Sequence, residues 1–315
     1  MTTATLDWYG CATFRLLTPE GMTVMLDAFL DRVPSADQSS VGVDDLAPTL
    51  TKGSWILVGH SHFDHLYGAE RLGAHGATII GSYETVRVMA DNGIPEHQLL
   101  AVAGGERIKL DDHTTVRVLP SLHSCSWAPD PMPPTGQVCL GDLDVDWRTR
   151  REHLQGFFDA QKPTLGDVAT AALQASDQHA RGDGGALTYV IETSQGSLLF
   201  ADTSGAWTGV LEGISPDVAI LATAGRANRN GEPVQGSLAD FVVDQALTVN
   251  AKRVIPAHHD NWLPGFTHQV DINPIRECFS QRASHIDFRE IGYASQFPLF
   301  ESLAQGDPTP APAPS

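Results

Sequence analysis

Between residues 60 and 65 the chain reads His60-Ser61-His62-Phe63-Asp64-His65, directly after the apolar run Trp55-Ile56-Leu57-Val58. Alternate side chains of a strand share a face, so His60 and His62 point toward one ion as the chain leaves this run. Asp64 and His65 come at a different offset. We expect a helical turn that begins near Leu66 to direct them toward a second ion.

Imidazoles and a carboxylate at this compact spacing are typical of metal sites. The alternative is a histidine-rich exposed turn, which explains the mixed residue types less well. The stretch 60–65 therefore predicts a metal site at the end of a strand.

The same six residues meet the HxHxDH signature in full, and here the chain resembles the metallo-β-lactamase superfamily. The resemblance implies three further ligands, each at the end of an expected strand. His123 is the expected third ligand of the first ion, Asp202 the carboxylate that bridges both ions, and His258 the ligand that completes the second.

His259 competes with His258 for the last of these roles. The pattern Pro256-Ala257-His258-His259-Asp260 resembles the Pro-x-His-Tyr-Asp of the ascorbate-6-phosphate lactonase-like branch, in which the first histidine binds metal. Because strand alternation lets only one of two neighbours face the ions, we favour His258.

Asp27 ends the expected strand 22–26 and matches the early aspartate of the superfamily. The resemblance implies that Asp27 supports the metal loop from behind, fixing the orientation of a ligand, and does not itself bind the ion. The alternative is an ordinary turn aspartate, which is common after a strand.

Short strand-like runs separated by Gly, Pro and Asp form two series along the chain. They cover residues 6–9, 12–17, 22–26, 55–58, 78–80 and 116–119, and then 187–192, 197–201, 218–222 and 253–255. Helical patterns at 83–92 and 237–247 lie between them, the second opened by a capping sequence at Ser237 and Asp240. Two strand-rich halves with helices outside match the four-layer αββα sandwich of the family.

We expect one domain over residues 1–306, with a largely helical insertion at about 125–185 and a disordered Pro/Ala-rich tail at 307–315. The insertion is expected to act either as a substrate lid or as an oligomer contact.

The formal net charge is −18, from 38 acidic against 20 basic residues. Such a surface repels phosphate backbones and disfavours a nucleic-acid substrate. Apolar runs stay short of the about 20 residues that span a bilayer, and the four scattered cysteines are expected to be free thiols. We therefore expect a cytoplasmic protein that binds no membrane, and leave a homo-oligomer open.

Two divalent ions about 3.5–4 Å apart share a hydroxide and clamp a developing oxyanion, which indicates a hydrolase. Asp64 is expected to orient the hydroxide besides ligating, and Asp202 to act with it in catalysis. Zinc is the expected metal, with manganese or iron as alternatives. The main zinc β-lactamase branch carries a thiolate where this chain has Asp202, which argues against β-lactam hydrolysis.

Substrate contacts are expected from the loop 225–231 and from nearby aromatic residues. Its two arginines suit a phosphate or carboxylate on the substrate, although a solvated polar loop explains them as well. The candidate contacts are Arg226, Arg229, His259, Trp127 and Trp262.

Three functions follow from these features. The first is a dinuclear hydrolase of a small-molecule ester, lactone or similar bond, with the lactonase/esterase type favoured. The second is a phosphodiesterase or nuclease of the same fold. The third is a non-hydrolytic metal-binding or redox member. The complete ligand set argues against a binding module without chemistry, and His62 stands where flavodiiron-type oxidoreductases normally have a glutamate.

Overall fold

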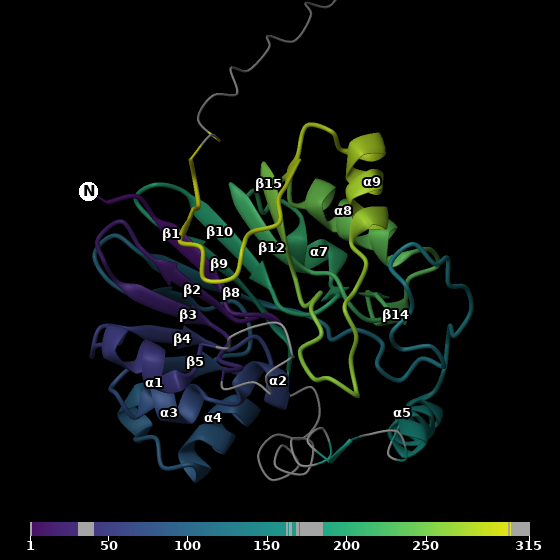
Figure 1. The fold of residues 1–315 in the computed structure, drawn as a ribbon, viewed down its shortest axis with the longest axis horizontal. Coiled ribbons are helices and arrows are strands. Elements are labelled where there is room, and N and C mark those ends of the chain that lie inside the picture. Colours follow the sequence, from purple (N-terminus) through teal and green to yellow (C-terminus); the bar gives the residue numbers. More distant parts are fainter. Residues whose placement is uncertain are drawn as a thin grey trace, which may run out of the picture.

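The computed structural model describes residues 2–30, 41–161 and 185–301, together with the isolated residues 163, 166, 167, 170 and 303. Two seven-stranded sheets pack face to face between helices (Figure 1). This architecture confirms the predicted αββα sandwich. The expected tail at 307–315 and the part of the expected insertion within residues 162–184, except 163, 166, 167 and 170, lie outside the described residues.

The first sheet has the strand order β17-β1-β2-β3-β4-β5-β6, with β3 to β6 parallel to one another. Its strands are β1 Thr5–Trp8, β2 Phe14–Leu17, β3 Thr23–Leu26, β4 Trp55–Leu57, β5 Thr78–Gly81, β6 Leu99–Ala101 and β17 Phe297–Pro298.

The second sheet has the order β16-β15-β12-β10-β9-β8-β7, with β10, β12, β15 and β16 parallel. Its strands are β7 Arg107–Lys109, β8 Thr115–Pro120, β9 Leu187–Glu192, β10 Ser197–Ala201, β12 Val218–Ala222, β15 Arg253–Ala257 and β16 Asp287–Phe288. A small third sheet joins β11 Gly205–Ala206, β13 Asn228–Arg229 and β14 Glu232–Pro233.

The main core lies between the two large sheets. Alternate residues of each strand point into it, such as Leu26 and Leu57 from the first sheet and Phe200 and Ile220 from the second. Tyr189 is wholly buried there, and its hydroxyl donates to the carbonyl oxygen of Val58 at 2.7 Å. This bond crosses from the second sheet to the strand that leads into the stretch 60–65.

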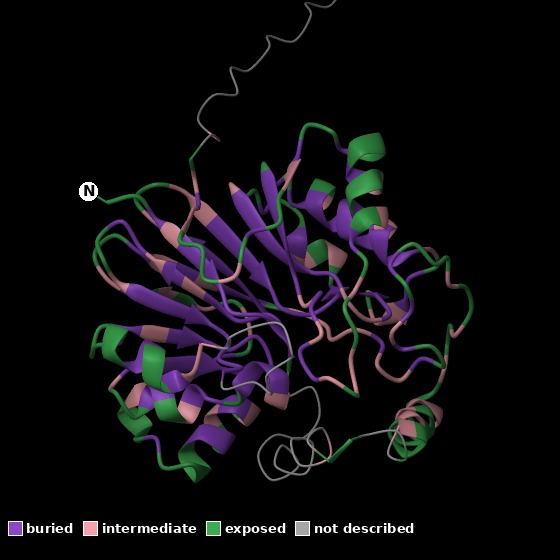
Figure 2. Cartoon of the chain, viewed as in Figure 1, coloured by how far each residue is buried: buried purple, intermediate pink, exposed green. Residues whose placement is uncertain are grey.

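Helices cover the outer face of each sheet, and Figure 2 shows their outward sides exposed while the strands are buried. The first sheet carries α1 Val43–Leu46, α3 Ala69–Gly73 and α4 Tyr83–Asp91; the second carries α7 Thr208–Leu211, α8 Leu238–Thr248 and α9 Asn273–Arg282. Two 3₁₀ turns, η1 Ala47–Thr49 and η2 Glu96–Gln98, lie in connections. None of the helices in the described part of the chain is long and apolar enough to cross a bilayer.

The predicted helix starts are present. Ser237 and Asp240 form a reciprocal capping box at the start of α8, and the Ser82 hydroxyl accepts from the backbone N–H of Thr85 at the start of α4. The helix α5, Trp147–Gln161, has no buried residue and lies on the surface within the expected insertion. The stretch 127–134 is irregular, as its prolines predict.

Candidate metal centre

The candidate ligands follow strands whose carboxyl ends point to one edge of the sandwich. The stretch 60–65 follows β4, and Asp27 follows β3, in the first sheet. His123, Asp202 and His258 follow β8, β10 and β15 in the second. Carboxyl ends of parallel strands share an edge, so the topology gathers residues that are almost 200 positions apart, such as Asp64 and His258.

His60, His62 and His123 form a first cluster whose ligand atoms lie within 4.8 Å of one another. The His60 Nε2 and His62 Nδ1 atoms are 3.1 Å apart, close to the roughly 3.3 Å between two nitrogens that share one zinc ion. The ring of His123 lies 4.7 Å from each of the other two. His62 and His123 are partly exposed, so the cluster opens toward solvent.

Asp64, His65 and His258 form a second cluster, together with Cys11. The Asp64 Oδ2 atom lies 3.5 Å from His65 Nε2 and 3.2 Å from His258 Nε2. The expected start of the helical turn near Leu66 was wrong. Helix α2 spans Phe63–Leu66 with His62 at its N-cap, so Asp64 and His65 already lie within the turn and project from it.

Asp202 joins the two clusters. Its Oδ2 atom lies 2.6 Å from His60 Nδ1 and 3.3 Å from His65 Nδ1, so it groups with one histidine of each cluster through the ring nitrogens opposite those that face the other cluster members. Its Oδ1 atom is buried without a hydrogen-bond partner in the described structure. Because a buried carboxylate oxygen needs a partner, this atom is open to an ion, and the bridging role stays a prediction.

Asp27 stands behind the second cluster. Its Oδ2 atom accepts from His65 Nδ1 at 2.6 Å, and its Oδ1 atom accepts from the backbone N–H of Gly59 at 2.8 Å. Asp27 has a left-handed backbone, with φ of 54°, which an aspartate tolerates better than most residues. The contacts are those of a residue that orients His65 and leaves its Nε2 atom to face the cluster.

The buried carboxylates require positive charge. Burial raises the pKa of Asp202 and raises that of Asp27 to about 7. Burial alone would lower the pKa of His65, but the carboxylates of Asp64 and Asp27 outweigh it and raise that pKa well above its usual value. Burial lowers the pKa of His60, which keeps its ring neutral, the form that binds metal. The donor set therefore fits divalent cations.

Asp27→Asn is expected to weaken metal binding by about 10–100-fold, because the amide presents either a donor or a neutral acceptor to His65 Nδ1. Asparagine tolerates the left-handed backbone, so the fold is expected to persist. Titration with a competing chelator measures the affinity. Asp112→Asn, at an exposed aspartate that pairs with Lys109, is the matched control, and equal affinities of the two variants would contradict the role of Asp27.

The arginines of the loop 225–231 do not contact the ligands. Arg226 is buried, and its Nη1 atom donates to the carbonyl oxygen of Val234 at 2.7 Å. Arg229 pairs with Asp244 of α8 at 2.7 Å. These contacts do not support the expected anion-binding role, because both guanidinium groups are directed into the loop and its helix.

The same loop instead supports His123. The Asn228 side chain donates to the carbonyl oxygen of His123 at 2.8 Å, and the backbone of Arg226 bonds with Cys125 and Pro131. His123 Nδ1 lies 2.9 Å from the carbonyl oxygen of Ser124, which leaves Nε2 to face the cluster. Asn228 was not among the expected site residues, since its amide carries no sequence signal apart from turn preference.

His258 lies in the second cluster, and His259 does not. The ring of His259 stacks on Trp8 at 4.7 Å, and its Nε2 atom faces Glu290 at 3.9 Å. Burial lowers the pKa of His259. Its neighbour Asp260 accepts from the backbone N–H of Cys11 at 2.8 Å, so both residues brace the loop that holds His258.

The two tryptophans have different surroundings. Trp127 lies under the guanidinium of Arg150 at 4.0 Å, a contact within the expected insertion. Trp262 lies edge-on to His258 at 5.6 Å and contacts Phe29 and Phe63 at 5.8 Å each. Trp262 therefore belongs to an aromatic wall beside the second cluster.

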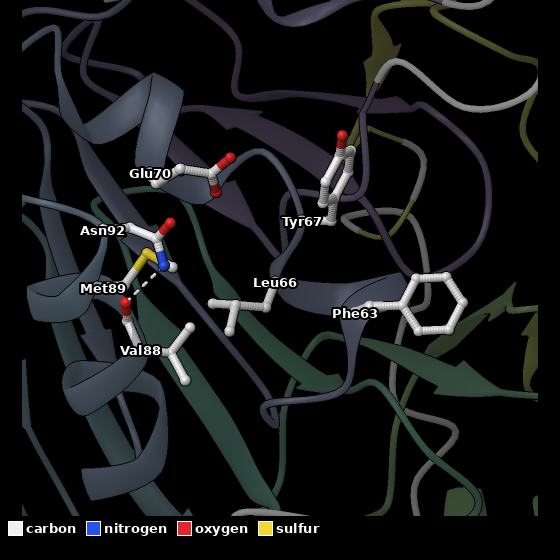
Figure 3. A pocket seen from close by; sticks show the side chains of 7 residues that line it. All are labelled: Phe63, Leu66, Tyr67, Glu70, Val88, Met89 and Asn92. Carbon is white, nitrogen blue, oxygen red and sulfur yellow. Dashed lines mark hydrogen bonds between the residues drawn. The ribbon is translucent and has the colours of Figure 1, made fainter. Parts of the chain in front are cut away.

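A small hollow lies between α2 and α4, and Figure 3 shows its side chains. Its lining consists of Phe63, Leu66, Tyr67, Glu70, Val88, Met89 and Asn92. No candidate ligand is part of this lining, so the hollow is separate from the metal centre.

Comparison with known proteins agrees with the geometry. The sequence profile of the β-lactamase superfamily domain matches residues 22–141. A UPF0173 metal-dependent hydrolase of Pyrobaculum neutrophilum is 33% identical over 122 residues, which are 38% of this chain and 51% of that protein. A UPF0173 metal-dependent hydrolase of Pyrobaculum islandicum is 36% identical over 122 residues, which are again 38% of this chain and 51% of that protein. The match thus spans about half the length of these curated relatives.

The solved structure of Igni18, a metallo hydrolase from Ignicoccus hospitalis, has the same fold, with a TM-score of 0.57 and 14% identity, covering 93% of this chain and 97% of that one. The profile match covers the signature stretch and His123, and the fold continues through the strands that carry Asp202 and His258. The profile match thus assigns residues 22–141 to the β-lactamase superfamily domain, and the described chain as a whole has the metallo-β-lactamase fold.

Proposed function

We propose that this protein is a metal-dependent hydrolase that holds two divalent ions and cleaves an ester, lactone or similar bond in a small molecule. One observation carries the proposal: two donor clusters at one sheet edge, joined by Asp202, which groups with His60 and His65. The names of the curated relatives support the hydrolase class.

His60, His62 and His123 would hold the first ion, and Asp64, His65 and His258 the second. When bound, such ions lower the pKa of a water molecule toward neutrality and polarise the oxygen of the bond to be cleaved. The mixed nitrogen and oxygen donors make zinc the proposed metal, with manganese or iron as alternatives.

Asp64 is the residue proposed to accept a hydrogen bond from the attacking water. Burial would raise its pKa, but His65 and His258 hold that pKa well below its usual range, so the carboxylate stays ionised at neutral pH. An ionised carboxylate is an acceptor only, which orients a donor toward the substrate. Asp27 keeps the His65 ring fixed during this step.

The aromatic wall beside the second cluster indicates the substrate class. Phe29, Phe63 and Trp262 contact one another, and Phe266 extends the wall to Phe158 of α5 at 6.3 Å. Apolar rings favour an apolar group on the substrate. The two loop arginines are directed elsewhere, so an anionic substrate has less support than a neutral one.

A substrate panel tests the proposal. We expect the zinc-loaded protein to hydrolyse aryl esters or lactones faster than bis(p-nitrophenyl) phosphate and β-lactams, and to lose the activity on chelation. Restoring the ion should restore the rate. A higher rate on the phosphodiester would favour a phosphodiesterase, and a loaded protein inert toward the whole panel would contradict the hydrolase assignment.

A further inference from the structure

Cys11 lies at the second cluster, although its spacing in the sequence gives no sign of this. It occupies the tight turn between β1 and β2, and its side chain is wholly buried. The thiol sulfur lies within 4.8 Å of ligand atoms of Asp64, His65 and His258. Four donors from three separate parts of the chain therefore surround one point.

The separations suit a single ion. A sulfur and an oxygen bound to one zinc ion in tetrahedral geometry lie about 3.5 Å apart, and two lighter donors about 3.3 Å. The Cys11 Sγ atom is 3.9 Å from Asp64 Oδ2, and Asp64 Oδ2 is 3.5 Å and 3.2 Å from the two histidine nitrogens. These three separations lie within about 0.4 Å of the values for a shared zinc ion.

The backbone ties Cys11 directly to a candidate ligand. Its carbonyl oxygen accepts from the backbone N–H of His258 at 2.8 Å, and its own N–H donates to Asp260 at 2.8 Å. Cys11 and His258 both have positive φ, 49° and 63°. A residue keeps such a sparsely populated backbone conformation only where the surrounding structure enforces it. The Cys11 thiol is thereby fixed relative to His258.

Cys125 is the matched comparison, because it is just as buried. Its thiol faces the carbonyl oxygen of Ala227 at 3.9 Å, and it is in none of the donor groups found in the described residues. Burial raises the pKa of the Cys125 thiol to about 12. Cys125 is a small packing residue, whereas Cys11 has a carboxylate and two imidazoles around its sulfur.

We infer that Cys11 is a fourth protein ligand of the second ion, which makes that site a Cys-Asp-His-His site. On binding, the thiol releases its proton to solvent and a sulfur lone pair forms the bond to the ion, so no oxidant or reductant takes part. Thiolate is a soft ligand, and the site should prefer zinc to manganese. The inference rests on the proposed function, since it needs an ion at this cluster.

Cobalt substitution of the full chain tests it. With Co²⁺ alone as the probe, the wild-type protein should show an intense sulfur-to-cobalt charge-transfer band in the near ultraviolet, and X-ray absorption should find one sulfur neighbour for the bound pair of ions. Cys11→Ser should lose the band and bind the second ion at least about 100-fold more weakly. Cys125→Ser should keep both band and affinity.

The outcomes separate the two proposals. Wild-type protein that binds two cobalt ions without a band or a sulfur neighbour overturns the role of Cys11 and leaves the metal centre intact. A band that persists in Cys11→Ser overturns it equally. Failure to bind cobalt at all overturns the metal centre itself. The wild-type spectra decide the question even if Cys11→Ser does not fold.

Discussion

His62→Ala is expected to remove one bound ion and to reduce kcat/KM by at least about 100-fold. Loss of a residue that only supports a metal ligand already costs about 10–100-fold, and loss of a ligand itself should cost at least as much. His62 supplies one of the three nitrogens of the first cluster, 3.1 Å from His60 Nε2. The first ion would keep only two imidazoles and a share of the predicted bridging carboxylate, and zinc sites use three or four protein ligands, so loss of one nitrogen should weaken binding. Metal analysis and turnover of the best substrate from the panel measure both losses.

The fold should survive this change. His62 is partly exposed and caps only the four-residue helix α2, so far-UV circular dichroism should stay unchanged. His97→Ala, at an exposed histidine of η2, is the matched control and should keep metal and activity. Full activity in a metal-free preparation of His62→Ala would refute the assignment of the first cluster.

Gly59→Ala is expected to disrupt the centre without touching a ligand. An added Cβ atom at Gly59 would lie 2.1 Å from Asp202 Oδ2, closer than two such atoms approach. The backbone cannot yield easily, since the Gly59 N–H donates to Asp27 and its carbonyl oxygen accepts from the N–H of Leu187, both at 2.8 Å. Asp202 must therefore move, which overpacks the site at a cost of about 1–3 kcal/mol.

We expect the free energy of unfolding to fall by that amount. We also expect the loaded protein to lose bound metal, because Asp202 is the predicted bridge between the two ions. Urea unfolding of the metal-free protein and metal analysis of the loaded protein give the two results. Gly53→Ala is the control, because the nearest atom to its added Cβ is the Thr51 hydroxyl at 3.9 Å. If Gly59→Ala matched Gly53→Ala in stability and metal content, the close approach of Asp202 would be unimportant.

The residues that the sequence predicted correctly as neighbours share a local signal. Each of His60, Asp202 and His258 follows an apolar run that is one of the strands, and His123 follows the alternating strand β8; the sheet topology then gathers these strand ends. The capping sequence at Ser237 is likewise a local pattern, and it correctly predicted the start of α8. The strand pattern and the signature stretch, read with the family resemblance they carry, thus predicted the sandwich and the clustering, while the ligand roles stay predictions.

The residues that were missed or misjudged depend on tertiary contacts. Cys11 was expected to be one of four scattered thiols, and only the folding of the β1–β2 turn against Asp260, 249 positions away, brings it to the cluster. Arg226 was expected to face a substrate. Instead, its guanidinium is buried and donates to the carbonyl oxygen of Cys139, which pairs with Gly236 in an isolated β-bridge. The very short strands β16 and β17 have no periodicity to detect.

The candidate ligands are divided between the two sheets: the stretch 60–65 follows a strand of the first, and His123, Asp202 and His258 follow strands of the second. Ions bound there would connect the two halves of the sandwich and would stabilise the folded state, because only that state binds them. At free ion 100-fold above the dissociation constant, binding adds about 2.7 kcal/mol to the folded state. Asp202 and His258 lie in the second half of the sequence, so most of the chain must be synthesised before all candidate ligands can come together. Under the proposed function, the supply of the divalent ion would then govern how firmly the two halves are held together.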